Sequence, residues 1–184
     1  LSMAGKQALR EFQTRLAERL QAARSQGVAA SWLAVRAGDE RLLVPLSHAA
    51  EIFSWTDVQR VPYVQPWFMG VANLRGNLSG VVDLAAFLQG RASVPRSALA
   101  LGQCRLVGFN ALLEAGCALL VDELLGMRTT QAFVRSSPRA ASDPDHFGHT
   151  YTDAQGGQWR ELSLQALSQQ PAFLEIGVQP VHQG

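Results

Sequence analysis

The segment from Phe68 to Asp83 constrains the fold most, because it holds two apolar runs separated by a short polar corner. The corner reads Asn73-Leu74-Arg75-Gly76, and a β-branched run resumes at Val81. Apolar runs on either side of a glycine-containing corner are typical of a β-hairpin. We therefore expect a strand through Val71, an exposed turn at the corner and a return strand through Val81. Arg75 is the one charged residue of the corner.

Composition limits the classes of partner. The chain has 184 residues, of which 47% are hydrophobic, enough for a substantial core in one domain or in one domain with two lobes. The net charge is +1, with both signs interspersed, so neither a nucleic-acid surface nor an acidic-membrane patch is favoured. The sequence has no apolar run long enough to cross a bilayer and no export signal pattern at its start. We expect a cytoplasmic protein without direct membrane insertion.

The two cysteines, Cys104 and Cys117, are too few for a disulfide framework. Both lie in apolar runs that have the texture of strands in the second half of the chain. We expect buried, reduced thiols on β-strands of the second lobe, in keeping with a reducing compartment.

Residues 1–30 form a segment of their own. A helix is predicted from Gly5 to Ser25, and Gly27 follows its end as a glycine commonly does. Two roles stay open for its apolar stripe, which would pack on the domain's own surface or bind a partner or a second copy. The stripe consists of Leu9, Phe12, Leu16 and Leu20.

The texture changes at residue 31 to short β-like runs separated by glycine-containing turns, and we assign residues 31–184 to one domain with two lobes. Short strands without long helices between them suggest small barrels rather than a parallel sheet. Residues 89–98 have little periodicity and form the natural connection between the lobes. Residues 131–151 are a second irregular stretch, and a loop of that length is either functional or mobile.

Catalytic and metal chemistry find little support in the sequence. Residues 143–149 hold two Asp and two His, but no helix or strand pattern would fix them as ligands, so a polar surface loop is predicted there. Asp122 and Glu123 are adjacent in a predicted strand, so their carboxylates point to opposite faces. Nucleophile elbows and phosphate-binding glycine patterns are absent. We expect no enzyme activity, no metal and no cofactor.

The aromatic residues before the corner leave two interpretations open. Trp55, Trp67 and Phe68 stand between polar residues. They would fill the core of a lobe, as aromatic side chains mostly do, or they would form an exposed edge that anchors a partner.

Several segments together resemble the CheW-like domain, the adaptor fold of bacterial chemosensory arrays. The similarity covers roughly residues 31–167 and includes the corner itself. Its overall texture is similar to that of family members from type IV pilus systems. The segments are residues 32–40 and 41–46, the Ala50-Glu51-Ile52 step, Val61-Pro62, the corner with Val81-Val82-Asp83-Leu84, residues 104–110, residues 118–127 and Leu162-Ser163-Leu164.

The resemblance implies a mainly β fold, with two small five-stranded SH3-like barrels side by side and an N-terminal helix. It implies an adaptor that couples the cytoplasmic tip of a methyl-accepting chemoreceptor to the regulatory domain of a CheA-type histidine kinase, at membrane-associated receptor arrays. The pilus-like texture implies an output in twitching motility. The competing class is a stand-alone β-barrel that binds a small molecule or a polysaccharide, which a deep, polar-lined pocket would favour.

The resemblance also implies a partner-binding surface at the corner, made of Asn73, Leu74, Arg75, Gly76, Glu51 and Val71. Arg75 matches the corner arginine of the family, and Glu51 matches a family glutamate that can pair with it. Considered without the resemblance, Arg75 would be a solvated turn charge. Two positions depart from the family pattern: Gly80 replaces a usual Pro, and Ser163 stands where the closing strand often has Asp or Asn.

Overall fold

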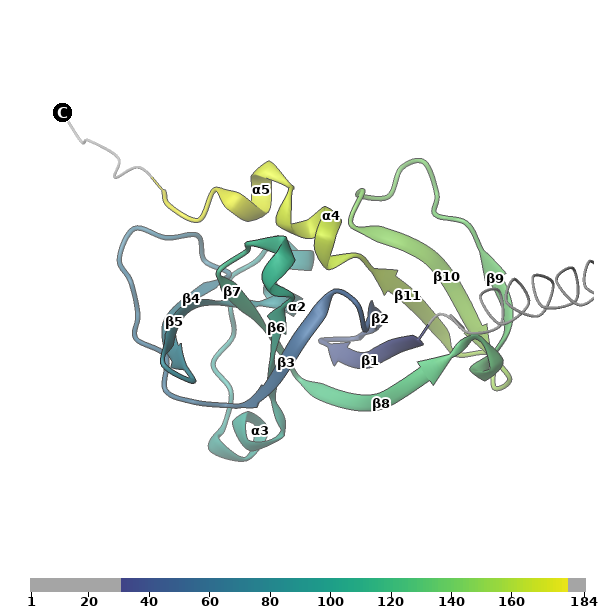
Figure 1. The fold of residues 1–184 in the computed structure, drawn as a ribbon, viewed down its shortest axis with the longest axis horizontal. Helices are drawn as coiled ribbons and strands as arrows, with labels where there is room; N and C mark the ends of the chain where they lie inside the picture. The colour runs from purple at the N-terminus through teal and green to yellow at the C-terminus, as the bar shows by residue number, and fades with distance from the viewer. Residues whose placement is uncertain (1–30, 179–184) are drawn as a thin grey trace, which may run out of the picture.

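The structure, a computed structural model, describes residues 31–178, and these form two β-sheets side by side (Figure 1). One sheet has six strands in the order β8-β1-β2-β11-β10-β9, antiparallel except for the β2–β11 pair. Its strands are β1 (Ser31–Ala37), β2 (Glu40–Pro45), β8 (Glu123–Thr129), β9 (Phe133–Ser137), β10 (Phe147–Asp153) and β11 (Gln158–Leu162).

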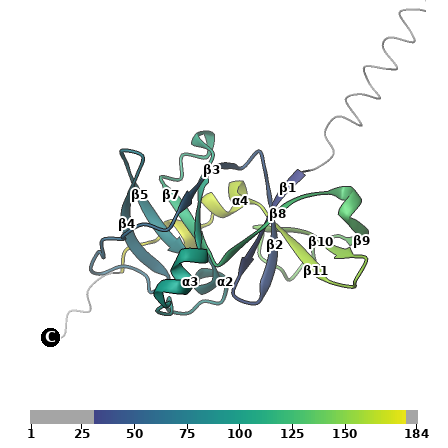
Figure 2. The same ribbon diagram turned by 90° about the horizontal axis from the view of Figure 1, so that it is seen from below.

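The second sheet has five strands in the order β3-β6-β7-β5-β4, and only the β5–β7 pair is parallel. Its strands are β3 (Ala49–Ser54), β4 (Phe68–Leu74), β5 (Asn77–Asp83), β6 (Arg105–Phe109) and β7 (Cys117–Val121). Seen from below, β4 and β5 lie at one end of the molecule and β9 and β10 at the other (Figure 2).

Short helices join and cover the sheets. Side-chain oxygens of Asp83, Ser97 and Ser163 cap the N-termini of three of them, as these residue types favour. The helices are α2 (Leu84–Leu88), α3 (Ala98–Gln103), α4 (Leu164–Ser168) and α5 (Pro171–Leu174), with 3-10 turns η1 (Ala111–Leu113) and η2 (Thr130–Ala132).

The buried apolar side chains form three layers. The largest lies between the sheets and draws on both, with Val35 and Leu42 from the six-stranded sheet packed in one cluster with Val82 and Leu119 from the five-stranded sheet. The second layer lies inside the six-stranded sheet, and successive residues of β1 point alternately into the largest layer and into this second one. The third layer lies on the other face of the five-stranded sheet. Because the middle layer is shared, the two sheets form one folding unit.

The mainly β, two-part architecture is confirmed, but three sequence expectations need correction. One sheet has six strands rather than five, because β9 forms inside the stretch 131–151 that was expected to be irregular. The expected closing strand ends at Leu162, and Ser163 instead caps α4. Residues 89–98 do not divide the sheets, because β1 and β2 pair with strands from the C-terminal half of the chain. The predicted N-terminal helix with Leu9, Phe12, Leu16 and Leu20 lies outside the described residues.

Both cysteines are buried free thiols, as expected. Cys117 begins β7, whereas Cys104 lies just before β6 and ends α3, so the strand placement is wrong for Cys104. Both lie next to or within the five-stranded sheet. Burial raises the pKa of the Cys117 thiol to about 12 and also raises that of Cys104, which keeps both protonated at neutral pH.

Candidate functional site

The predicted hairpin forms at the corner, with Leu74 paired to Asn77 across a two-residue turn. Arg75 and Gly76 both have positive φ, 49° and 85°, as a type I′ turn requires at its two central residues. The side-chain oxygen of Asn73 accepts a hydrogen bond from the backbone N–H of Gly76 at 2.7 Å. The Asn and Gly of the corner therefore serve the turn, and Arg75 is left at its tip.

Arg75 pairs with Glu51, as the resemblance implied. The arginine side chain is 74% exposed and the glutamate side chain 36% exposed, so the pair lies at the surface. Glu51 belongs to β3 and Arg75 follows β4, the two opposite edges of the five-stranded sheet. The ion pair shows that this sheet curls until its edges approach, as in a small barrel.

A shallow hollow of about 260 Å³ adjoins this ion pair. Phe53 and Leu74 contribute apolar surface to it, and η1 and the start of β7 form the other walls. The Arg75 guanidinium lies 6.0 Å from the centre of the Phe53 ring. A cation, a carboxylate and an apolar floor thus share one exposed concave surface.

The remaining predicted residues have more structural roles. Leu74 is buried, and its side chain belongs to the outer layer of the five-stranded sheet. Val71 is half-buried and exchanges two backbone hydrogen bonds with Gln59, 2.8 and 2.9 Å long. Gly80 donates its N–H to the carbonyl of Gly116 at 3.0 Å, a bond that the usual Pro could not make. Of the predicted set, Asn73, Arg75 and Gly76 are exposed, and Arg75 and the partly exposed Glu51 are its two charged groups.

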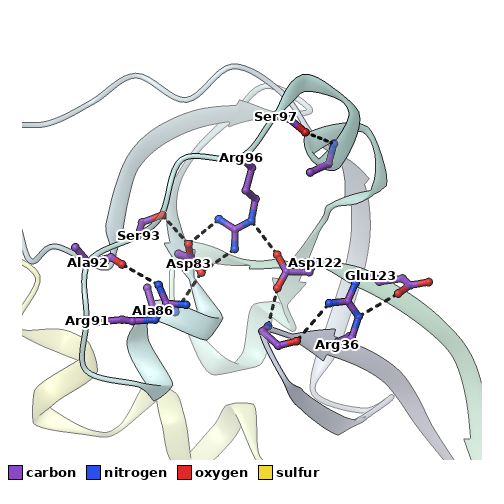
Figure 3. A network of polar contacts seen from close by, with 12 residues as sticks. Arg36, Asp83, Ala86, Arg91, Ala92, Ser93, Arg96, Ser97, Asp122 and Glu123 are labelled. Atoms are coloured by element: carbon purple, nitrogen blue, oxygen red, sulfur yellow. Dashed lines mark hydrogen bonds and ion pairs between the residues drawn. The ribbon is translucent and has the colours of Figure 1, made fainter.

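A polar cluster centred on Arg96 was not predicted as a site (Figure 3). The Arg96 guanidinium binds both carboxylate oxygens of Asp83, at 2.7 and 3.2 Å, and one oxygen of Asp122 at 2.8 Å. The other oxygen of Asp122 accepts the N–H of Gly38 from the β1–β2 turn at 2.6 Å. Ser93 donates to Asp83 at 2.6 Å. Arg96 therefore joins the end of β5, the crossover from β7 to β8 and a turn of the six-stranded sheet.

The cluster lies largely out of solvent. Burial alone would raise the pKa of Asp83, but the hydrogen bonds from Arg96 and Ser93 outweigh it and lower that pKa. Asp83 and Asp122 both directly follow apolar runs in the sequence, which was the available signal for buried acids. Their partner could not be identified in advance, because Arg96 belongs to a stretch without periodicity. Asp122 and Glu123 do point to different partners, Arg96 and Arg36.

A larger open groove of about 680 Å³ lies elsewhere on the five-stranded sheet, between residues 55–69 and 93–101. Trp55 lines this groove and is only partly buried, whereas Trp67 and Phe68 are buried in the middle layer, with one edge of Phe68 reaching the groove. Core packing therefore holds for two of the three aromatic residues. The groove and the corner hollow share no lining residue and lie toward opposite ends of β4, because Phe68 and Met69 line the groove and Leu74 lines the hollow.

The acidic and histidine-containing segment forms ion pairs. Asp143 lies 3.5 Å from Arg160, and Asp145 lies 3.1 Å from Arg139. His146 is buried, which corrects the expectation of a polar surface loop at that position. Within residues 31–178, no group of three or more His, Cys, Asp or Glu side chains is arranged to hold a metal ion. In the same residues, no helix is long and apolar enough to span a bilayer.

Known proteins share this architecture and sequence pattern. The chain is 29% identical over 154 residues to protein PilI of Pseudomonas aeruginosa, an alignment that covers 80% of this chain and 82% of PilI. It is 29% identical over 113 residues to a probable chemotaxis protein CheW of Rhizobium etli, over 60% of this chain and 68% of the relative.

The solved structure of the scaffolding protein TtCheW from Thermoanaerobacter tengcongensis has the same fold, with a TM-score of 0.55 at 13% identity over 73% of this chain and 88% of that one. The family model of the CheW-like domain matches residues 31–172. This range contains both sheets, the corner with Arg75 and the Arg96 cluster. The chain belongs to the CheW-like domain family.

Proposed function

We propose that this protein is a non-catalytic adaptor that couples a methyl-accepting chemoreceptor to a CheA-type histidine kinase in a chemosensory array. Membership of the CheW-like family supports an adaptor role. The observation that carries the proposal at the level of residues is the exposed Arg75 at the tip of a tight turn, paired with Glu51 over an apolar hollow. The protein would act in the cytoplasm, at receptor arrays associated with the membrane.

The similarity to PilI, over four-fifths of both chains, favours an output in type IV pilus twitching. The partners would be the helical tip of the receptor and the regulatory domain of the kinase. Neither a nucleic acid nor a cofactor has a role in this proposal. The adaptor would hold receptor and kinase in a fixed geometry, so that the state of the receptor biases the activity of the kinase.

The corner is suited to a partner that supplies a carboxylate and an apolar side chain. An exposed ion pair contributes about 0–1 kcal/mol to folding, so Glu51 and Arg75 can exchange partners at little cost. Once a partner excludes water, a charge-assisted bond from the Arg75 guanidinium becomes stronger and more directional. A stand-alone barrel that binds a small molecule or polysaccharide would instead need a deep polar pocket, and both grooves described above are open rather than deep.

Arg75→Glu tests the proposal. In the hairpin the change places a new carboxylate near Glu51 at the surface, so the melting temperature should fall only slightly. At a desolvated interface the reversed charge should cost several kcal/mol, which lowers affinity by about two decades or more. The measurement is a binding titration against receptor tip and kinase regulatory domain, with a melting curve alongside.

Arg135→Glu is the matched control, because Arg135 is an exposed arginine on β9 of the other sheet. Its affinities should equal those of the wild type. Unchanged affinity of Arg75→Glu for both partners would remove Arg75 from the interface. A large fall in its melting temperature would instead assign Arg75 a structural role through Glu51.

A further inference from the structure

The short helix α3 exposes apolar side chains that a helix would normally bury. Its sequence, Ala98-Leu99-Ala100-Leu101-Gly102-Gln103, is almost entirely apolar, yet none of its residues is buried. Leu99 is 80% exposed and Val94, just before the helix, is 54% exposed. An apolar helix normally turns such side chains toward a core. In α3, Leu99 is instead presented to solvent, and Leu101 is only half-buried.

The segment that carries α3 is attached to the body through polar contacts. Ser93 donates its backbone N–H to Pro66 at 2.9 Å and its hydroxyl to Asp83 at 2.6 Å. Arg96 adds the three bonds to Asp83 and Asp122 described above. The buried side of this segment is thus ionic and its outer side is apolar. Such an arrangement costs free energy in an isolated monomer, which points to a surface that is covered in use.

The groove next to α3 has apolar residues between its charged ones. Its lining includes Trp55, Val58, Val61, Met69, Val94 and Leu101. Val94 at the rim of the groove and Leu99 on α3 together form an exposed apolar ridge along the edge of this groove. A ridge and a groove side by side are the shape elements of a self-complementary contact between two copies related by a two-fold axis.

The charges on this face are also self-complementary. Asp57 and Arg60 both line the groove, and both are exposed. Within residues 31–178, neither side chain makes a hydrogen bond or ion pair. In a two-fold contact each Arg60 can meet the Asp57 of the other copy, so two ion pairs form at once and no charge of this pair is left unmatched.

We infer that the groove and α3 form a docking surface for a second copy of this chain, with the Val94–Leu99 ridge of each copy in the groove of the other. This inference goes beyond the proposed coupling of receptor and kinase. Because the groove and the corner share no lining residue, a dimer of this kind leaves both Arg75 corners available to partners. Self-association would then add a contact by which adaptors extend an array.

The test is sedimentation velocity of the full-length chain across the micromolar range. The wild type should show a concentration-dependent dimer. Leu99→Asp should raise the dissociation constant at least tenfold, which corresponds to about 1.4 kcal/mol. Val134→Asp is the matched control, because Val134 is 71% exposed on β9 of the other sheet and does not line the groove, and its dissociation constant should equal that of the wild type.

A charge swap tests the two-fold geometry. Arg60→Asp and Asp57→Arg should each weaken the dimer, and the double variant should restore it, because the pair is regenerated with its signs exchanged. A wild type that stays monomeric throughout would overturn the inference. So would a dimer that survives Leu99→Asp, or a double variant no better than the single ones.

Titrations with receptor tip and kinase regulatory domain, run on the same variants, keep this inference separate from the proposed function. Loss of kinase binding in Leu99→Asp, together with a monomeric wild type, would assign the surface to the kinase and overturn the second copy as its occupant. Failure of both partners to bind the wild type would overturn the proposed function and leave the dimer measurement standing on its own.

Discussion

Two glycines of the corner hairpin differ in what an added side chain would meet. Gly76 has φ +85° but no neighbouring atom within 4 Å of an added Cβ, so Gly76→Ala should cost about 1 kcal/mol through backbone conformation alone. Gly70 has φ +136°, and a Cβ there would overlap the backbone carbonyl of Gln59. Gly70→Ala should therefore cost several kcal/mol. Denaturant unfolding of both variants measures the difference, and equal costs would contradict the close approach of residue 59 to β4.

His146 makes stability depend on pH. The side chain is buried against the Phe147 ring, with ring centres 4.4 Å apart, and its Nε2 has no hydrogen-bond partner. Burial lowers its pKa, while the 2.8 Å hydrogen bond between Nδ1 and Gln170 opposes that shift. Arg160 lowers the pKa further and Asp145 raises it.

As the pH falls below the ordinary histidine pKa of about 6.5, His146 therefore takes up a proton more readily in the unfolded chain than in the folded chain. The free energy of unfolding should fall as pH drops below that value and level off once the pH passes below the folded-state pKa. His146→Gln should flatten part of this slope, with the remainder due to His48, whose pKa burial also lowers. An unchanged slope in His146→Gln would contradict the prediction.

At the scale of single residues, the local sequence pattern was sufficient to predict the corner turn but not the polar cluster around Arg96. The turn follows from chemistry contained in four consecutive residues, so Asn73 and Gly76 could be placed from sequence. Glu51 was named only through the resemblance, because its approach to Arg75 depends on the curl of a whole sheet. Arg96 was missed, since its partners are 13 and 26 residues away in sequence.

At the scale of elements, the irregular segment 89–97 matters for stability because it carries Arg96. Arg96 pairs with the buried Asp83 and the half-buried Asp122, whereas Arg36 forms an exposed pair with Glu123 at 3.1 Å. Arg96→Ala leaves Asp83 and Asp122 without their cation and should cost about 3–5 kcal/mol. Arg36→Ala is the control and should cost about 1 kcal/mol or less. Chemical denaturation measures both, and a similar small cost for Arg96→Ala would mean that water replaces the guanidinium.

The positions of the strands could be predicted from the sequence pattern, but their pairing into sheets could not. Strand positions followed from apolar runs such as Cys117–Val121, which is buried on both faces. Membership of a sheet did not follow, because β1 and β2 reach β8 and β11 across most of the chain. Local hydrophobicity carries no information on such long-range pairing. The lobe boundary at 89–98 was wrong for this reason, although the strands on both sides of it were expected.

On the scale of the whole molecule, the middle layer decides how the protein unfolds. This layer packs strands of both sheets against each other, so neither sheet keeps its core if the other opens. We therefore predict a single cooperative transition. Leu43 is fully buried inside the six-stranded sheet, away from the middle layer, and Trp55 packs against the outer layer of the five-stranded sheet. A substitution at Leu43 can therefore be made in one sheet while the fluorescence of Trp55 reports on the other.

Leu43→Ala should destabilise the fold by about 2–5 kcal/mol, as large-to-small changes in a core do. In backgrounds where either Trp55 or Trp159 is the fluorescent reporter, the midpoint of denaturation should shift equally for both. Trp159 lies in the six-stranded sheet beside Leu43, so it would report local damage even if the sheets were independent. A shift seen by Trp159 and not by Trp55 would mean that the two sheets unfold separately. Equal shifts would mean that the shared layer transmits the loss to the sheet that carries the Arg75 corner.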